Sequence, residues 1–362
     1  MIVKELRQLF RDPRSKRVIF VAPVIQLVLF GYAVNTDVRN VATFLVDHDR
    51  SSASRELVDA FTASGYFRVV GRSDSAVGLA RALDTGEATV GIEIPAGFAA
   101  NLAAGRSPAV QFLVDGTNSN TGTIVSGYAA KIVQQAGIRA VEGTGRELPP
   151  LPDLRTRAWF NPSLESRVYN VPAVIGVIVL LMCLLLTALA VVRERELGTL
   201  EQLLVSPLTP TELILGKTIP VAGIALIQLT LVTTVALLWF HIPLRGPILV
   251  LLLAAALFIL AGLSFGLLIS TISNTQQEAF LAMFLFLLPS IILSGFLYPV
   301  ETMPWIFQQL TLLNPLRHFL EVVRAIFLKG SGIRELWGQL SVLAAMALAG
   351  VVFATRRFSR TT

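Results

Sequence analysis

Three consecutive residues, Gly216, Lys217 and Thr218, match the end of a phosphate-binding loop. In such a loop, G-x-x-x-x-G-K-[ST], the first glycine lets backbone N–H groups wrap around the phosphates of a nucleotide. Here Thr211 occupies the position of that glycine, an apolar run follows directly, and no other G-K-[ST] occurs in the chain. We therefore expect no nucleotide site and no catalytic residue for nucleotide hydrolysis on this chain.

Other groups that could do chemistry are sparse. The single cysteine, Cys183, lies inside an apolar run, which excludes an intrachain disulfide and a cysteine-based metal site. The three histidines are scattered without ligand spacing: His48, His241 and His318. Asp47, Asp49 and Asp115 follow predicted strands, where ligands often bind in α/β folds. Turn and helix-cap chemistry is the alternative for these aspartates, and we favour it, so we expect no metal, no bound cofactor and no enzyme active site.

The composition indicates an integral membrane protein. Apolar residues make up 54% of the 362 residues, charged residues only 15%, and soluble domains carry roughly 25% charge. The net charge of +6 comes from basic residues beside apolar runs, so it indicates membrane topology and not nucleic-acid binding. Six apolar runs are long enough to span a membrane. We predict that they are helices, because a helix satisfies all its backbone hydrogen bonds within itself and lipid offers none. They cover residues 18–34, 171–192, 219–240, 247–272, 279–298 and 336–354.

Basic residues also predict the orientation. They form one cluster at each end of the chain: Lys4, Arg7, Arg11, Arg14, Lys16 and Arg17, then Arg356, Arg357 and Arg360. Such clusters mark the cytoplasmic side, so both termini and the loop 193–217 are expected there, and 35–170 outside. The first run could instead be a signal peptide, but it contains Pro23 and Gln26 and lacks a cleavage site, which favours an anchor. Residues 1–17 predict an amphipathic interfacial helix, with a frayed basic tail as the alternative.

The long outer segment predicts a separate extracytoplasmic α/β domain over 35–170. Strand patterns alternate with helical patterns, and serine caps and glycine stops mark helix ends. The expected strands lie in "VATFLVDHD", which ends in polar turn residues, "YFRVV", "TVGIEIP", which ends at Pro95, and "AVQFLVDG", and the longest expected helix covers 118–141. A proline-rich stretch at 147–157 then leads back to the membrane domain, residues 171–362.

The cytoplasmic loop predicts a docking helix over about 194–207. Its leucines and one valine, in "LGTLEQLLV", make full solvation unfavourable, and Pro207 and Pro210 end the helical pattern. A plain solvated loop is the alternative. An amphipathic helix suspended between two membrane runs is typical of a surface that binds another chain.

These stretches resemble a known family. "RERELGTLEQLLVSPLTPTELILGK" at 193–217 resembles the coupling-helix signature of membrane-permease subunits in type-2 ATP-binding-cassette (ABC) exporters. "WFNPSLESRVYNVPAVIGVI" at 159–178 resembles the start of their second span, and "KELRQLFRDPRSK" their interfacial helix. "FLYPVETMPWIFQQLTLLNPLRHFLEVVRAIFLKG" at 296–330 resembles their outer re-entrant hairpin. The large segment between spans one and two resembles the multidrug-efflux subgroup.

The resemblance implies a permease subunit in the bacterial inner membrane. It would work with a second permease chain, identical or homologous, and with separate ATPase subunits that bind ATP and Mg; a periplasmic adaptor is a further candidate partner. Contacts with the ATPase would come from the coupling segment: Glu194, Glu196, Gly198, Thr199, Leu200, Glu201, Leu203 and Pro207. The substrate would be hydrophobic or amphipathic, drug-like or lipid-like, and would leave the cytoplasm or inner membrane.

Two further groups of residues are candidates for a role in transport. The re-entrant hairpin, about 297–328, holds Pro315, Arg317, Glu321 and Arg324, whose charges lie either at membrane depth or in water. Polar residues within the spans could line a substrate path or simply bridge helices: Gln228, Thr233, Thr234, Ser264, Ser270 and Ser290. The competing function is a membrane receptor or scaffold that uses the outer α/β domain to bind a ligand without transport.

Overall fold

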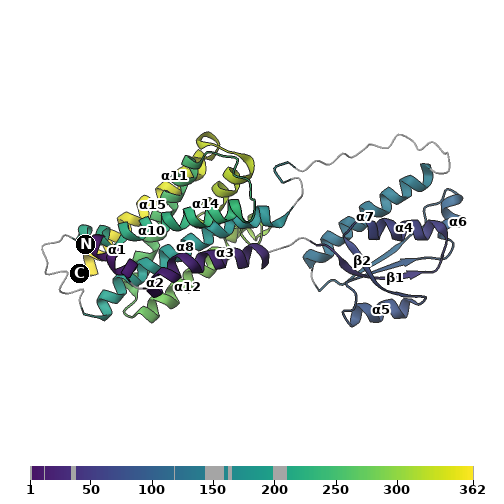
Figure 1. Ribbon diagram of the computed structural model, residues 1–362, viewed down its shortest axis with the longest axis horizontal. Helices are drawn as coiled ribbons and strands as arrows, with labels where there is room; N and C mark the ends of the chain where they lie inside the picture. The colour runs from purple at the N-terminus through teal and green to yellow at the C-terminus, as the bar shows by residue number, and fades with distance from the viewer. Residues whose placement is uncertain are drawn as a thin grey trace. The chain divides into compact units, whose positions relative to one another are not determined.

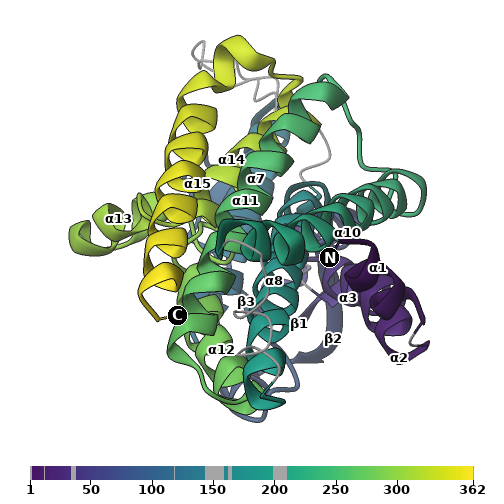
Figure 2. The same ribbon diagram turned by 90° about the vertical axis from the view of Figure 1, so that its left-hand side faces the viewer.

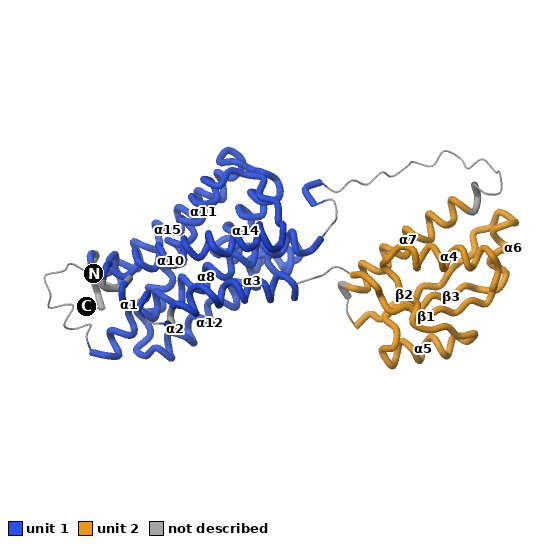
Figure 3. The backbone as a smooth tube through the Cα atoms, in the orientation of Figure 1, with its two compact units in different colours: residues 1–35, 157–362 blue, residues 36–156 orange. Residues whose placement is uncertain are grey.

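The chain forms two compact units in a computed structural model, residues 1–35 with 157–362 and residues 36–156 (Figures 1 and 3). The structure describes the chain over these ranges: 2–11, 13–33, 38–117, 119–142, 159–161, 165–198 and 210–361. The first unit is helical, and the second is a sheet with helices on both faces.

The α/β unit is built on a four-stranded sheet in the order β2-β1-β3-β4. Its strands are β1 (Val41–Asp47), β2 (Phe67–Ser73), β3 (Val90–Ile94) and β4 (Gln111–Val114). Strand β1 pairs in parallel with β2 and β3, and β4 is antiparallel to β3. The helices are α4 (Ser52–Ala63), α5 (Ala76–Asp84), α6 (Phe98–Ala103) and α7 (Ser119–Glu142).

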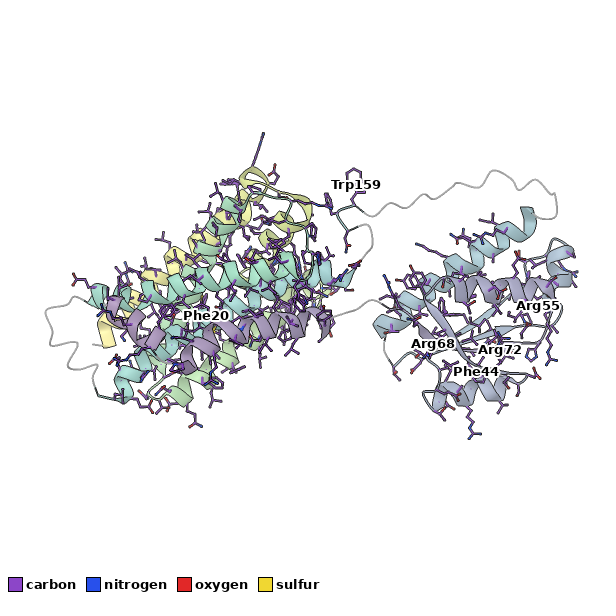
Figure 4. The ribbon with its side chains drawn as sticks, in the orientation of Figure 1. Phe20, Phe44, Arg55, Arg68, Arg72 and Trp159 are labelled. Atoms are coloured by element: carbon purple, nitrogen blue, oxygen red, sulfur yellow. The ribbon has the colours of Figure 1, made fainter. Side chains whose placement is uncertain are left out.

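Apolar side chains on both faces of the sheet hold these layers together. Helices α4, α6 and α7 cover one face around Phe61 and Ile92, and α5 covers the other around Phe44, labelled in Figure 4. The helices begin where serine side chains accept hydrogen bonds from backbone N–H groups: Ser51 from Ser54 N at 3.0 Å and Ser75 from Val77 N at 3.2 Å.

The helical unit begins with α1 (Ile2–Arg11), α2 (Pro13–Lys16), the π-helical turn η1 (Arg17–Val21) and α3 (Ala22–Ala33). Its long helices are α8 (Ser166–Glu196), α10 (Pro210–Leu238), α11 (Ile248–Ile272), α12 (Gln276–Ile292) and α15 (Ile333–Thr361). Between α12 and α15 lie η2 (Val300–Thr302), α13 (Trp305–Thr311), α14 (Pro315–Arg324) and the π-helical turn η3 (Ala325–Lys329).

Helix α8 forms the centre of this unit, because it packs against α3, α10, α11, α12 and α14. Figure 2 shows α11 and α15 side by side, and their contact is extensive. Small residues allow close approach: a Cβ on Gly266 of α11 would lie 2.8 Å from Thr187 Cβ and 3.3 Å from the Cys183 carbonyl oxygen of α8.

Four helices among the described residues are long and apolar enough to span a membrane: Ser166–Glu196, Ile214–Leu238, Ile248–Ile272 and Ile333–Arg357. Two further apolar helices are shorter, Arg17–Ala33 and Gln276–Ile292. The chain is thus a mostly helical polytopic membrane protein, and a count of six spans stays a prediction. The predicted fifth run, 279–298, is too long, because its helix ends at Ile292 before a turn in which Gly295 has φ +78°.

The N-terminal helix α1 packs against α10. Its residues Ile2, Val3 and Phe10 are exposed, and the Phe10 ring lies 6.0 Å from the ring of Phe20, labelled in Figure 4. Exposed apolar side chains on a basic helix suit a membrane surface, so the interfacial location remains our prediction.

Candidate functional site

The end of α8 places three consecutive charged residues, Glu194, Arg195 and Glu196, in one turn. The helix then stops: Leu197 N and Gly198 N donate to the carbonyls of Arg193 and Arg195, and Gly198 has φ +70°. A left-handed glycine is a common helix end, because other residues are strained there. Glu194 and Glu196, predicted to open a separate coupling helix, therefore belong to the last turn of α8.

The remaining predicted coupling residues lie outside the described part of the chain. These are Thr199, Leu200, Glu201, Leu203 and Pro207. The structure instead resolves how the segment is attached to the helical unit on either side, at the end of α8 and at the start of α10.

Glu194 pairs with Lys217 of α10. The Lys217 Nζ lies 3.3 Å from Glu194 Oε1 and donates to the Ala190 carbonyl at 3.0 Å. The Lys217 side chain is 2% exposed and that of Glu194 is 16% exposed, so this is a buried ion pair. Thr218 Oγ1 donates to the Ile214 carbonyl of its own helix. The Gly-Lys-Thr sequence therefore lies inside a helix, with its lysine bonded to a neighbouring helix.

Arg195 and Glu196 contact the facing ends of two further helices. Arg195 Nη1 donates to the carbonyls of Ser270 at 3.2 Å and Ser273 at 2.7 Å, at the end of α11. A cation there satisfies orphan carbonyls and suits the helix dipole. Glu196 Oε2 accepts from the Gln276 side-chain amide at 2.6 Å and the Gln276 backbone N–H at 3.4 Å, at the start of α12. One turn of α8 thus holds α10, α11 and α12.

Sequence reasoning missed Arg195, Lys217 and Gln276 as members of this site. A signal existed for Lys217, which is the one cation in the apolar run 213–239. An ionisable residue in such a run usually faces a partner inside the bundle. No local pattern marked the contacts of Arg195 and Gln276, because their partners are far away in sequence.

The predicted hairpin residues are grouped on α14 and its neighbours. Arg317 donates to Glu321 Oε1 at 3.3 Å and also to Thr311 Oγ1, and Glu321 Oε2 accepts from Gln339 Nε2 of α15 at 2.8 Å. Pro315 is buried in the first turn of α14. This part of the site is a bonded network that joins α13, α14 and α15.

Arg324, at the end of α14, is bonded less completely. Its Nη1 donates to the Gly295 carbonyl at 3.1 Å, and its guanidinium carbon lies 3.7 Å from the centre of the Tyr169 ring. Its Nε and Nη2 are buried and have no hydrogen-bond partner among the described residues. Arg324 therefore links the beginning of α8 to the turn after α12.

The predicted path residues are spread over α10, α11 and α12, and most bond within their own helix. The hydroxyls of Thr234, Ser264, Ser270 and Ser290 donate to carbonyls three or four residues earlier. Gln228 and Thr233 differ: both are buried, and the Gln228 amide atoms and Thr233 Oγ1 have no partner among the described residues.

The strand-end aspartates of the α/β unit perform turn and cap chemistry. Asp47 accepts from the backbone N–H groups of Asp49 and Arg50 and from Ser54 Oγ. The hydroxyl of Ser51 and the backbone N–H of Ala99 lower the pKa of Asp49, and Asp115 accepts from Thr117 N. Among the described residues, no set of three His, Cys, Asp or Glu side chains is placed to hold a metal ion.

Comparison with known proteins supplies the family. A family model described as "ABC-2 family transporter protein" matches residues 17–356. The chain is 35% identical over 340 residues to the probable multidrug ABC transporter permease YbhR of Escherichia coli (strain K12), covering 94% of this chain and 92% of that protein. It is 34% identical over 333 residues to YbhS, a probable multidrug ABC transporter permease of the same organism, covering 91% and 88%. It is 31% identical over 364 residues to the inner membrane transport permease YhhJ, also of that organism, covering 99% and 96%.

These matches confirm the predicted transport function over a non-transporting receptor or scaffold. They also confirm that the chain is a permease subunit and not an enzyme, with ATP hydrolysis on a separate subunit. The family model covers residues 17–356, which include the end of α8 and the helices α10, α11 and α12 that contact it. The chain therefore belongs to the ABC-2 family of transporter proteins.

Proposed function

We propose that this permease exports a hydrophobic or amphipathic compound, drug-like or lipid-like, and that the segment after Gly198 receives the motion of the ATPase. Two similar proteins are named multidrug permeases, which supports this substrate class. A second permease chain and two ATPase subunits complete the transporter, and ATP with Mg is held by the ATPase. A periplasmic adaptor is a further partner that the outer α/β unit could bind.

The attachment of the segment carries this proposal. Residues 199–209 are joined on one side to the last turn of α8 and on the other to α10, and Glu194 and Lys217 bond these two helices together. Arg195 and Glu196 add the ends of α11 and α12. A displacement at Gly198 therefore acts on four helices at once. Coupling requires that the ATPase contact this segment differently in its two states.

The proposed membrane placement has six spans. A helix of 17 residues, such as Arg17–Ala33 or Gln276–Ile292, is about 26 Å long at 1.5 Å per residue. That is close to the roughly 30 Å hydrocarbon core, and modest bilayer thinning covers the difference. Basic residues at both ends support an orientation with the termini and the coupling segment in the cytoplasm and the α/β unit outside the inner membrane.

We assign different roles to the polar residues of the bundle. Gln228 and Thr233 are our path candidates, since buried polar atoms without partners are unfavourable unless something else bonds them. Thr234, Ser264, Ser270 and Ser290 bond their own helices, which favours a structural role. The network of Pro315, Arg317, Glu321 and Arg324 would lie at the outer end of the bundle and stabilise it.

ATPase activity of the reconstituted complex tests the proposal. We expect Glu196→Gln with Leu200→Ala to abolish the substrate-stimulated activity, while the basal activity and the amount of permease in the membrane stay normal. The matched control is Glu87→Gln with Val77→Ala, at two exposed positions of the α/β unit. Normal stimulation in the first variant would refute the coupling role. If no ATPase co-purifies with the wild-type permease in mild detergent, the proposed complex with an ATPase is refuted before any variant is compared.

A further inference from the structure

One corner of the helical unit joins three segments through backbone hydrogen bonds. Gly246 N and Arg245 N, in the loop between α10 and α11, donate to the carbonyls of Ile326 at 2.9 Å and Phe327 at 3.3 Å. These carbonyls belong to the last turn of η3, where a helix leaves its carbonyls without partners. The loop therefore satisfies the end of η3 and is held beside the start of α15.

The contact between loop and turn is close at Gly330. This residue has φ +77°, and a Cβ there would lie 3.3 Å from the Arg245 carbonyl oxygen. Arg245 Nη1 also donates to the Leu328 carbonyl at 3.0 Å, which fixes the guanidinium over the turn. The position of Arg245 is thus set by both its backbone and its side chain.

Three cations lie on the segments that form this corner, Arg245, Lys329 and Arg334, and all are exposed. Among the described residues, Lys329 and Arg334 have no acidic partner within ion-pair distance. The one nearby carboxylate in sequence, Glu335, accepts from Gly332 N at 2.8 Å. The corner therefore carries a net positive charge, three cations against one carboxylate, on segments that backbone hydrogen bonds hold together.

The depth of the corner is set by the helices that begin there. Arg245 lies three residues before Ile248, where one candidate spanning helix starts, and Arg334 is the second residue of another. Trp337 and Ile333 are 70% and 57% exposed one turn apart on that helix. Exposed tryptophan at a span end is typical of the headgroup level of a membrane. The abundant acceptor at that level is the lipid phosphate.

We propose that Arg245, Lys329 and Arg334 form a binding site for the headgroup of an anionic phospholipid. The phosphate would bridge the α10–α11 loop and the start of α15, two segments that no described side-chain pair joins directly at this corner. In the orientation proposed above, the lipid belongs to the outer leaflet. The lipid site requires only that the chain spans a membrane. A test of this site is therefore independent of which substrate the permease exports.

Energy transfer from Trp337 tests this site locally. The chain has four tryptophans, so Trp159→Phe, Trp239→Phe and Trp305→Phe leave Trp337 as the only donor. The purified full-length chain in neutral detergent is titrated with phosphatidylglycerol that carries dansyl on its acyl chain. Arg245→Gln, Lys329→Gln and Arg334→Gln form the corner variant. Arg68→Gln, Arg72→Gln and Arg81→Gln on the α/β unit form a control of equal charge; Figure 4 labels Arg68 and Arg72.

A cation near the membrane surface changes lipid affinity about fivefold, so the corner variant should need on the order of 100-fold more lipid. The control should bind lipid like the parent chain. The single change Lys329→Gln should lower lipid affinity about fivefold, and it provides a test if the triple variant folds poorly. Inorganic phosphate should not displace the lipid. Equal titrations of the corner variant and control, equal energy transfer from Trp337 to dansyl-phosphatidylcholine, or full displacement by inorganic phosphate would each overturn the proposal.

Discussion

The ion pair between Glu194 and Lys217 allows a quantitative test of how the coupling segment is anchored. We consider Glu194→Gln, Lys217→Met and the double variant. Each single change removes one charge of a pair whose side chains are 16% and 2% exposed, at a distance of 3.3 Å. The double change replaces the pair with neutral groups of similar volume. Together they form a double-mutant cycle that isolates the pair from its surroundings.

The structure sets different costs for the two single changes. Glu194→Gln removes the Glu194 carboxylate from the buried Lys217 ammonium, and the loss of one member of a buried ion pair costs about 3–5 kcal/mol of unfolding free energy. Lys217→Met leaves a carboxylate that keeps some contact with water, so we expect about 1–3 kcal/mol. The double variant has no uncompensated charge and should lie near the wild type. The coupling energy should therefore be about 4 kcal/mol or more.

An exposed pair in the same chain is the control. Arg167 and Glu165 lie 2.6 Å apart, with side chains 50% and 27% exposed. The cycle of Arg167→Met and Glu165→Gln should give less than about 1 kcal/mol, because water screens the pair. Stability is measured by denaturant titration in bicelles, and ATPase stimulation is measured on the same variants in the complex.

Two results would refute this reasoning. The first is a coupling energy for Glu194 and Lys217 no larger than that of Arg167 and Glu165. The second concerns function. We expect the double variant to regain stability but to show weaker ATPase stimulation, because the ion pair no longer joins α8 to α10. Full stimulation in the double variant would show that the pair only stabilises the fold.

Three further predictions concern other parts of the chain. Arg195→Gln should remove the bonds to the α11 carbonyls, cost about 1–3 kcal/mol and reduce ATPase stimulation more than basal activity. Gly266→Ala should lower the thermal midpoint because its Cβ would meet Thr187, whereas Gly223→Ala, with nothing within 4 Å, should be neutral or stabilising; scanning calorimetry compares them. The pKa of Asp49 is lowered by its bond to Ser51, so its contribution to stability is present above about pH 4 and lost as the pH falls through the folded pKa. Asp49→Asn should therefore flatten the acid limb of an unfolding curve followed by circular dichroism.

Elements with local signals were predictable from the sequence. Strand β1 and helix α4 follow from an apolar run and from the serine that caps the helix, and both lie where those signals put them. Strand β2 was predicted to end at Val70 but continues to Ser73. The reason is non-local: a register shift between Thr43 and Phe44 of β1 keeps β2 paired beyond a bulge. No pattern within β2 itself reports that pairing.

In the candidate site, too, features with local sequence signals were predictable and features set by distant partners were not. Charges beside a membrane run were visible in the sequence, so Glu194 and Glu196 were found, but they were assigned to the helix that follows. The leucine pattern continues through Gly198, and only the backbone shows that this glycine adopts a left-handed turn that ends α8. Gly-Lys-Thr was interpreted as the end of the helix that follows and not as a phosphate-binding loop, and it does lie in α10. What no local pattern indicated is that the partner of Lys217 lies 23 positions away.

Helix geometry explains why one turn of α8 can hold three neighbours. Successive residues on an α-helix point about 100° apart, so Glu194, Arg195 and Glu196 face three directions. Each direction offers a complementary group: the Lys217 ammonium, the carbonyls at the end of α11, and the amides at the start of α12. The order acid, base, acid is therefore specific, since a base at 194 or 196 would meet a cation or backbone N–H donors. Exchanging Glu194 and Arg195 preserves the charge of this turn but mismatches two of the three contacts. A loss of ATPase stimulation in that exchange, with the net charge unchanged, would distinguish directed contacts from a general electrostatic attraction.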